Sequence, residues 1–472
     1  MSAAHVRMRR SNVKPSVLPI TSLEFEWNQL CEYYLPVLAG ESIWRFSRNP
    51  APDDPEQGWK LHLSATILSA NKLLQKVGPF LRCNGVMFKG PKSIEQLANL
   101  NSGLRYGFSQ VGKFITVYPQ DVGEAIRLAR KLSTLTRGLP APAVPYDIEF
   151  RRGSCVYYRY GVFGETHIKR GTRSISALRK PDGSLIPDRR EPGFAVPSWL
   201  SDPFKNISSG SADYHNPLMT SFRAYEAMSQ RGKGGVYRAL DLTVAPARLC
   251  VVKEGRQHGE TDFSGRDGRW RVTHEHRVLS ALRSSGVNVA QIYDSFKLEG
   301  HYYLVTELIN GRNLQEIVRS SELSTAAVLK YARQAAQIVA RIHAAGWVWR
   351  DCKPLNLIAW RSGRLRPIDF EGACSISTLD PVPWGTPGYV CPRPGDNTIE
   401  SHLPEDLYAL GATLYHLFSG RPPGTKRIPR LSGDVWRRVP AKAKEVTTAL
   451  LNPDWRIRPS AKITADVLRE IE

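Results

Sequence analysis

Closely spaced cysteines are missing from this sequence. Its seven cysteines lie far apart, without a CxxC pair, at positions 31, 83, 155, 250, 352, 374 and 391. A structural zinc site or a dithiol redox site needs such pairs, and disulfide scaffolds need many cysteines in a short chain. The pattern therefore predicts free thiols in a reducing cytoplasm, with neither disulfides nor zinc.

Long apolar runs are missing as well. A membrane-spanning helix needs about 18 or more consecutive apolar residues, and the sequence has no such run. The N-terminal stretch MSAAHVRMRRSN is basic, but no apolar segment of the kind found in secretory signals follows it. We therefore expect a cytoplasmic protein without a membrane span, beginning with a flexible basic arm over residues 1–20.

Acidic residues are few relative to basic ones. The sequence has 65 Lys and Arg and 44 Asp and Glu, which gives a net charge of +21. Such an excess fits nucleic acid as a partner, or a solvated basic surface suited to acidic or phosphorylated peptides. The basic residues are dispersed, and no nucleic-acid-binding fingerprint is present. The distribution favours the second interpretation, without nucleic acid as a partner.

The chain divides into two predicted domains. Its 472 residues are enough for two hydrophobic cores. Strand-like and helix-like stretches alternate first, and the helices of SIEQLANLN and DVGEAIRLARKL open with the spacing of capping boxes. Residues 164–215 are rich in Gly, Pro, Ser and Arg, and we interpret them as a connector with a hairpin in RKPDGSLIPDRR. The predicted fold is α+β, with domains over 21–205 and 216–472.

The strongest motif is WVWRDCKPLNLI, at residues 347–358. It resembles the catalytic loop of protein kinases, and PIDFEGA downstream resembles their metal-binding D-F-G motif. The resemblance implies that Asp351 accepts the proton of the substrate hydroxyl and that Lys353 contacts the γ-phosphate. It further implies that Asn356 and Asp369 hold a metal ion.

Other kinase motifs occur in the expected order upstream. Lys253 in LCVVKEG and Glu275 in RVTHEHRVLSAL fit the pair that lies beside the nucleotide phosphates, and Glu307 in YLVTELING fits the hinge. The glycine-rich loop is expected in SQRGKGGVY, at Gly232, Gly234 and Gly235. The resemblance covers residues 220–470 and implies a bilobal kinase fold that uses ATP or GTP with Mg²⁺.

Several positions depart from the kinase pattern. Trp349 replaces the usual histidine, at a position that mainly packs, and Glu371 replaces the glycine of D-F-G, which should stiffen the activation segment. Arg393 stands where an acid normally pairs with Arg458, and we expect it to point to solvent or to find an acid such as Glu400 or Glu405. The departures leave a pseudokinase scaffold as an alternative, although every metal and phosphate group is present.

Basic residues on strands distinguish the first domain. In GWKLHLSAT, Lys60 and His62 alternate with apolar residues, which is the period of a β-strand. Lys89 in GVMFKG, Lys113 in GKFITVYP and Arg159 in SCVYYRYGVF lie in similar apolar contexts. Each alone would be a solvated surface residue. Together they predict a phosphate pocket that holds an acid and a base.

The K-x-H strand, the later lysines and YYRYG, followed by a kinase, resemble class III lanthipeptide synthetases. In that family a phosphothreonine-lyase-like domain precedes a Ser/Thr kinase. The family phosphorylates Ser or Thr of a precursor peptide, which carries a leader segment, and then eliminates phosphate to leave dehydroalanine or dehydrobutyrine. The resemblance therefore implies a kinase and a phosphate-eliminating lyase in one chain.

The resemblance also assigns roles in the elimination. Lys89 would be the base, Lys60 would stabilise the enolate-like carbonyl, and protonated His62 would donate to the leaving phosphate. For Lys89 to be neutral, its pKa must fall below the ordinary value of about 10.4, which Lys60, Arg159 and partial burial would favour. The phosphate would be held by Arg159, Lys113 and Arg105.

The family normally ends with a zinc cyclase. Here the kinase motifs reach the end of the sequence, and the last cysteine and histidine, Cys391 and His416, lie inside them. We therefore expect dehydration without cyclisation, with ring formation left to a separate cyclase or tailoring enzyme. A kinase whose first domain only binds phosphopeptides is a further alternative.

Overall fold

The computed structural model describes residues 17–38, 40–164, 166–205, 216–320, 323–360, 363–392 and 401–471. Helix α1 (Val17–Tyr34) begins within the predicted basic arm, so residues 17–20 are helical. The remainder of that arm, together with Arg393 and Glu400, lies outside the described residues.

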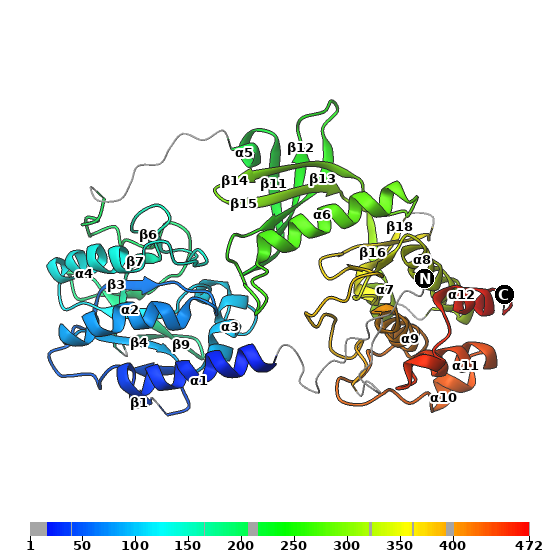
Figure 1. Cartoon of the computed structure of the whole chain (residues 1–472). Coiled ribbons are helices and arrows are strands. Elements are labelled where there is room, and N and C mark those ends of the chain that lie inside the picture. Colours follow the sequence, from blue (N-terminus) through cyan, green and yellow to red (C-terminus); the bar gives the residue numbers. More distant parts are fainter. Residues whose placement is uncertain are drawn as a thin grey trace, which may run out of the picture.

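The first domain is built on a seven-stranded antiparallel sheet with the strand order β1-β2-β4-β5-β3-β7-β6 (Figure 1). Its strands are β1 (Val37–Leu38), β2 (Trp44–Phe46), β3 (Gln57–Leu63), β4 (Met87–Pro91), β5 (Ile115–Tyr118), β6 (Ile148–Glu149) and β7 (Val156–Val162). Helix α1 is joined by α2 (Ala70–Cys83), α3 (Ile94–Ser102), the 3₁₀ turn η1 (Phe108–Gln110) and α4 (Val122–Leu135). The strands predicted from sequence are present.

Strand β3 follows the predicted alternation. Trp59, Leu61 and Leu63 are buried in one hydrophobic cluster with residues of α1, α2, α3 and α4. Lys60 and His62 alternate with them and therefore point to the opposite face of the sheet. They are buried too, with exposed fractions of 9% and 5%, so both faces of this strand are covered.

Helices α3 and α4 begin at the predicted caps. The side chain of Ser93 accepts from the N–H of Gln96 over 3.0 Å, and Asp121 accepts from Glu124 over 2.8 Å. Each cap satisfies a backbone donor that the first helical turn leaves unpaired.

The segment interpreted as a connector is in part a small folded sheet. Its strands β8 (His167–Arg170), β9 (Arg173–Arg179) and β10 (Leu185–Pro187) pair in the order β10-β9-β8. The hairpin predicted in RKPDGSLIPDRR is confirmed, because Leu185 pairs with Arg179. This corrects the interpretation for residues 167–187, because a stretch that pairs as a three-stranded sheet is folded structure rather than a linker.

The second domain has the predicted two kinase lobes. The N-terminal lobe is a sheet of order β11-β12-β13-β15-β14 with helix α6 packed beside it (Figure 1). Its elements are α5 (Pro217–Thr220), β11 (Phe222–Arg231), β12 (Gly234–Asp241), β13 (Arg248–Gly255), α6 (Gly268–Ser284), β14 (Ile292–Leu298) and β15 (His301–Glu307).

The C-terminal lobe is mainly helical. Its helices are α7 (Leu314–Ser320), α8 (Thr325–Ala344), η2 (Pro354–Asn356), α9 (Leu403–Ser419), α10 (Asp434–Arg437), α11 (Ala441–Leu450), η3 (Trp455–Ile457) and α12 (Ala461–Arg469). Short strands accompany them: β16 (Gly311–Asn313), β17 (Trp347–Val348), β18 (Leu357–Trp360), β19 (Leu365–Pro367) and β20 (Cys374–Ser375). A single hydrophobic cluster runs from α6 into this lobe and joins the two lobes.

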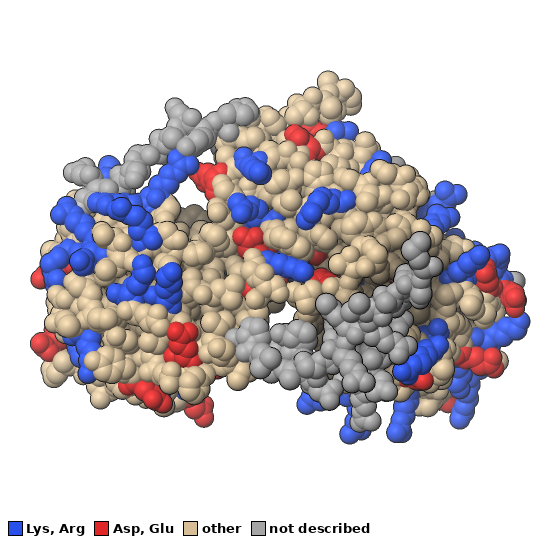
Figure 2. Space-filling model, in the orientation of Figure 1, with Lys and Arg blue, Asp and Glu red and all other residues tan. Residues whose placement is uncertain are grey.

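Charge is spread over the face of the molecule seen in Figure 2, as the sequence suggests. Figure 2 shows lysines and arginines scattered over the visible face, interrupted by uncharged and acidic residues. Among the helices in the described ranges, none is both long enough and apolar enough to cross a bilayer.

Candidate active sites

Strand register brings the basic residues of the first domain together. Lys60 on β3 is paired with Arg159 on β7, and Thr116 on β5 is paired with His62 on one side and Lys89 on the other. Directly opposite residues in an antiparallel sheet point to the same face. These side chains therefore converge on the face of the sheet away from helices α1 to α4.

They line a small cavity of about 40 Å³. Its walls are formed by Trp44, Lys60, His62, Lys89, Gln110, Lys113, Thr116, Tyr118, Arg159 and Arg190. The Nζ of Lys89 lies 4.6 Å from the ring centre of Trp44, so the aromatic wall holds this lysine by cation–π attraction. Such a concentration of basic side chains around one small cavity favours an anionic ligand such as phosphate.

Arg105, the remaining residue predicted to hold phosphate, does not line this cavity. It is exposed in the loop after α3, with its guanidinium 5.6 Å from the ring centre of Tyr106. Arg190, which follows the confirmed hairpin, lines the cavity in its place. The prediction for Arg105 is wrong because the left-handed turn at Gly103 ends α3 and leads the chain into solvent.

His62 is paired with Asp147, a residue that the sequence analysis missed. The Nδ1 of His62 lies 2.5 Å from the Oδ2 of Asp147, whose side chain has no exposed surface. The other carboxylate oxygen lies 3.5 Å from Lys113 Nζ. The only sequence signal was an acid between apolar residues, in VPYDIEF.

The protonation of His62 in the free protein differs from the expectation. Burial lowers the pKa of His62 to about 3, and Asp147 offsets only part of that shift. Burial raises the pKa of Asp147, but His62 and Lys113 outweigh it and keep the carboxyl ionised. Because a carboxylate only accepts hydrogen bonds, Nδ1 carries the proton and Nε2 has a free lone pair. A protonated His62 therefore requires a bound anion.

Both lysines of the predicted chemistry have lowered pKa values. Burial, with Arg190 and Lys113, lowers the pKa of Lys89 to about 8. Burial and the charge of Lys89 lower the pKa of Lys60 well below its ordinary value. The pKa of Lys89 is thus lowered, as expected. The neighbouring charges that lower it are those of Arg190 and Lys113 rather than those of Lys60 and Arg159. The cavity can hold a neutral amine at neutral pH.

Arg159 is held by the segment that follows the hairpin. Its Nη2 donates to Asp188 over 2.6 Å and to the carbonyl of Arg189 over 2.8 Å. Both Arg159 and Asp188 are buried. The stretch PDRR at the end of the hairpin therefore supplies both the anchor of Arg159 and a further cation, Arg190.

The catalytic loop of the second domain forms a connected polar cluster. Lys353 Nζ donates to Asp351 and to the hydroxyl of Thr386, both over 2.7 Å, and that hydroxyl donates to Asp351. Asn356 Nδ2 donates to Asp351 over 2.9 Å. Burial raises the pKa of Asp351, although Lys353 opposes it. Asp351 is therefore positioned by three donors and can accept a proton.

The nucleotide side of the kinase site is also assembled. Lys253 Nζ donates to both carboxylate oxygens of Glu275, over 2.6 and 2.7 Å. Burial pulls the pKa of Asp369 upward, but nearby lysines, first Lys253 and then Lys233, hold it below its ordinary value. These are the expected partners of nucleotide phosphates and a divalent cation.

A metal ion fits the residues predicted to hold it. Asn356 uses its Nδ2 on Asp351, which leaves its carbonyl oxygen for a cation, and Asp369 supplies an ionised carboxylate. Such oxygen donors are the ligands that Mg²⁺ prefers. Magnesium would neutralise charge on the nucleotide phosphates.

Two residues predicted to bind nucleotide have other contacts. The side chain of Glu307 is bonded to Arg366 over 2.5 and 2.8 Å, and its backbone N–H donates to the Gln291 carbonyl over 2.8 Å. The N–H of Gly232 donates to the carbonyl of Ser102 in the first domain over 3.0 Å. Gly234 and Gly235 line a cavity of about 140 Å³ beside Lys253 and Asp369, which we call the nucleotide cavity.

The departures from the kinase pattern have structural explanations. Trp349 is fully buried and donates its indole N–H to the Asp369 carbonyl over 2.8 Å. Glu371 does not adopt a positive φ, so this position does not need glycine, and its carboxylate is paired with Lys233. Arg458 donates to the carbonyls of Pro404 and Asn452 in place of an acid.

Glu405, which was a candidate partner for Arg393, is already engaged. Its carboxylate pairs with Arg350 over 2.9 Å and with His402 over 2.8 Å. It stabilises the catalytic loop through Arg350, directly before Asp351.

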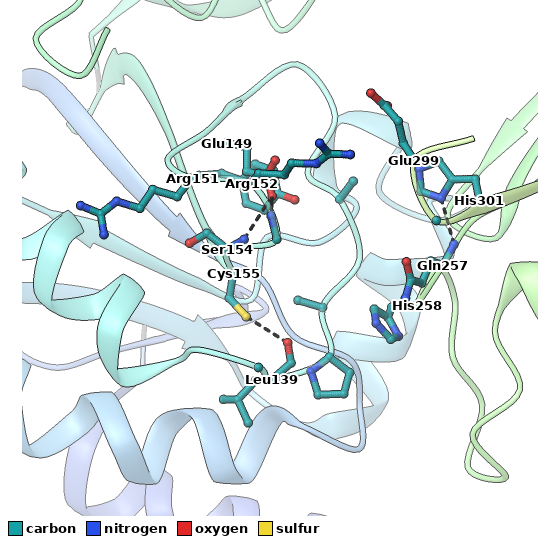
Figure 3. Close-up of a pocket in the computed structure, with 17 residues that line it drawn as sticks. Leu139, Glu149, Arg151, Arg152, Ser154, Cys155, Gln257, His258, Glu299 and His301 are labelled. Carbon is teal, nitrogen blue, oxygen red and sulfur yellow. Dashed lines mark hydrogen bonds between the residues drawn. The ribbon is translucent and has the colours of Figure 1, made fainter. Parts of the chain in front are cut away.

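A wide cleft of about 830 Å³ lies between the first domain and the N-terminal kinase lobe. Figure 3 shows Arg151, Arg152 and Glu149 on one side of it and His258, Glu299 and His301 on the other. Its walls carry side chains of both charges together with apolar ones such as Leu139, Pro140 and Ala141.

Comparison with known proteins agrees with the class that the fold and the second site define, a protein kinase. Residues 225–467 match the family model described as protein kinase domain. Residues 38–213 match the one described as RamC, N-terminal domain. The chain therefore belongs to the protein kinase family and carries a RamC N-terminal domain ahead of its kinase domain, the arrangement expected from the resemblance to class III lanthipeptide synthetases.

Individual relatives match stretches of this chain that differ in length. A probable SapB synthase of Streptomyces coelicolor is 30% identical over 366 residues, which are 74% of this chain and 39% of that protein. The serine/threonine-protein kinase AfsK of Streptomyces griseus is 30% identical over 204 residues, 42% of this chain and 24% of that protein. The serine/threonine-protein kinase pkn2 of Myxococcus xanthus is 28% identical over 220 residues, 44% of this chain and 25% of that protein. The chain thus spans well under half the length of these relatives.

Proposed function

We propose that this chain dehydrates a ribosomally made precursor peptide in two steps. The kinase domain phosphorylates a Ser or Thr hydroxyl with ATP or GTP, and the first domain then eliminates the phosphate. The observation that carries the proposal is the convergence of Lys60, His62, Lys89 and Arg159 on one cavity, in a chain that also holds a complete kinase site. The similarity to a SapB synthase supports a peptide substrate, which we expect to carry a leader segment.

In the first step, Asp351 accepts the proton of the substrate hydroxyl as its oxygen attacks the γ-phosphate. Lys353, which lies 2.7 Å from Asp351, is placed to hold the transferred phosphoryl group. Lys253 holds the nucleotide phosphates while Glu275 keeps its ammonium in position. Asn356 and Asp369 would hold Mg²⁺.

In the second step, Lys89 in its neutral form takes the Cα proton of the phosphorylated residue. The electron pair forms the Cα–Cβ double bond as the bond from Cβ to the phosphate oxygen breaks. Lys60 donates a hydrogen bond to the carbonyl oxygen on which negative charge develops, a role that its amine can perform in either protonation state, and Lys113, Arg159 and Arg190 hold the phosphate.

His62 delivers a proton to the leaving phosphate. The phosphate dianion beside Nε2 favours the imidazolium form, as does Asp147 on the other side of the ring, and so offsets the effect of burial. The proton thus resides on His62 only when substrate is bound. Asp147 positions the ring by accepting from Nδ1.

The test is a comparison of peptide masses after incubation with nucleotide and Mg²⁺. We expect the wild-type protein to give dehydrated peptide and Asp369→Asn to give unmodified peptide. Lys89→Ala and His62→Ala should accumulate phosphorylated peptide, because the kinase groups lie in another domain. The matched control is Lys72→Ala, which removes an exposed lysine of α2 and should behave as wild type.

The same masses separate the alternatives. If wild-type protein left the peptide phosphorylated, the first domain would be a phosphopeptide-binding module. If it left the peptide unmodified and bound no nucleotide, the chain would be a pseudokinase scaffold. If Lys89→Ala and His62→Ala both dehydrated the peptide at the wild-type rate, the elimination site would lie elsewhere.

A further inference from the structure

The glycine-rich loop of the kinase carries a lysine at its turn. Strands β11 and β12 pair as far as Arg231 and Gly234, so Gly232 and Lys233 form a two-residue turn between them. Both turn residues have fixed backbone contacts. The N–H of Gly232 donates to Ser102, and the carbonyl of Lys233 accepts from the N–H of Arg256 over 2.9 Å.

The side chain of Lys233 reaches into the nucleotide cavity. Its Nζ is paired with the carboxylate of Glu371, the residue that replaces the glycine of D-F-G. Both residues line a cavity of about 140 Å³, together with Lys253 and Asp369. The cavity therefore has one ammonium group from the sheet and a second from the loop above it.

We propose that Lys233 is a nucleotide-binding residue that contacts the terminal phosphates, and that Glu371 holds its ammonium in place until those phosphates bind. This inference rests on the proposed kinase function. Lys253 is paired with Glu275 and its side chain is 17% exposed, so the loop lysine is the more exposed of the two cations. The side chain of Lys233 is 25% exposed and that of Glu371 is 8% exposed.

The exchange of partners requires little rearrangement. The backbone of the turn is held by Ser102 and Arg256, so only the flexible lysine side chain has to rotate. A phosphate oxygen replaces a carboxylate oxygen as acceptor, and both are charge-assisted hydrogen bonds. The lysine thus passes from one anion to another and is not left unpaired between them.

The position of Lys233 predicts which part of the nucleotide it contacts. It lines the cavity beside Asp369 and Lys253, whereas Glu307 of the hinge is not among the lining residues. The contact therefore lies at the phosphate end, and adenosine, which has no phosphates, should not depend on it.

The test is nucleotide binding by the full chain, measured by calorimetry with ATP and Mg²⁺ and separately with adenosine. We expect Lys233→Ala to raise the Kd for ATP about tenfold, as for a lost hydrogen bond to a charged group, and to leave that for adenosine unchanged. Lys233→Arg should retain most of the ATP affinity. Lys297→Ala, at an exposed lysine of β14, is the matched control.

Glu371→Gln tests whether Lys233 binds phosphate or only stabilises the loop through its ion pair. If Lys233 binds phosphate, neutralising Glu371 frees the lysine and leaves ATP affinity equal to or higher than that of wild type. Equal losses in Lys233→Ala and Glu371→Gln would show that the pair only stabilises the loop, and an unchanged ATP affinity in Lys233→Ala would refute the contact. A wild-type protein that bound no ATP would instead refute the kinase function itself.

Discussion

The backbone N–H of Gly232 donates to the carbonyl of Ser102 over 3.0 Å, which places the turn of the kinase glycine-rich loop on the C-terminal end of helix α3 in the first domain. The neighbouring Asn101 uses its side chain to bind the Ala65 carbonyl over 2.9 Å and the Gly112 N–H over 3.2 Å. Ala65 lies just beyond β3 and Gly112 directly precedes Lys113. The nucleotide loop and the wall of the basic cavity therefore share one short segment of chain.

This contact predicts that a side chain at position 232 will impair the kinase. A Cβ added to Gly232 would lie 1.6 Å from the carbonyl oxygen of Asn101, so the loop must move away from α3. We expect Gly232→Ala to lower the rate of peptide phosphorylation several-fold, because the loop no longer holds the nucleotide phosphates in place. Phosphate transfer from labelled ATP measures this rate.

Gly424 supplies a matched control for this variant. Gly424→Ala introduces a Cβ that meets no atom within 4 Å, and it should be neutral. Elimination from a chemically synthesised phosphopeptide should survive in Gly232→Ala, because α3 remains part of the first domain's core. An unchanged rate of phosphorylation would show that the domain contact is dispensable.

The parts of both sites that could be predicted lie on regular elements with a defined period or on contiguous motifs. Lys60 and His62 could be placed on one face because a strand has a period of two. The catalytic loop could be placed because Asp351, Lys353 and Asn356 occur within six consecutive residues. In each case the spacing along the chain determines the spacing in space.

The residues that were missed are brought in by long-range packing. His62 and Asp147 are 85 positions apart, and Arg159 and Asp188 are 29 apart. No local pattern marks either acid as the partner of a buried cation. The requirement itself is physical, because a buried arginine needs a nearby carboxylate, but the sequence does not show which of many acids fulfils it.

The Arg159–Asp188 pair leads to a prediction about stability. Both side chains are buried, with exposed fractions of 3% and 0%, so Asp188→Ala would leave a guanidinium unpaired inside the protein. Removing one partner of a buried ion pair typically costs about 3–5 kcal/mol. In urea unfolding, we expect Asp188→Ala to lower the free energy of unfolding of the first domain by that amount.

The matched control lies in the same hairpin. Asp182 has a side chain that is 65% exposed, and Asp182→Ala should cost at most about 1 kcal/mol. If Asp188→Ala were as stable as this control, the ion pair would not hold the hairpin segment against the sheet. The position of Arg190 at the cavity would then not depend on this ion pair.

The lowered pKa of Lys89 predicts how elimination depends on pH. Its pKa in the free protein is about 8, and only the neutral amine can take the Cα proton. Below that pH the neutral fraction rises about tenfold per unit, and above it the fraction is nearly constant. Elimination also needs a proton on His62, which the free protein lacks, and this uptake offsets the loss of the proton from Lys89. With a synthetic phosphopeptide as substrate, kcat/KM should therefore be level between about pH 6 and pH 8 and fall about tenfold per unit above pH 8, since this parameter reports the free enzyme and substrate.

A conservative variant separates the base from a general effect of pH. Arg190→Gln removes the charge that contributes most, after burial, to the lowered pKa of Lys89. The pKa of Lys89 should then rise, which moves the start of the fall to higher pH, while weaker phosphate binding lowers the profile as a whole. The inflection of the control Lys72→Ala should stay where it is in wild type. A profile that falls between pH 6 and pH 8, or an inflection that Arg190→Gln does not move, would mean that a group other than Lys89 removes the proton.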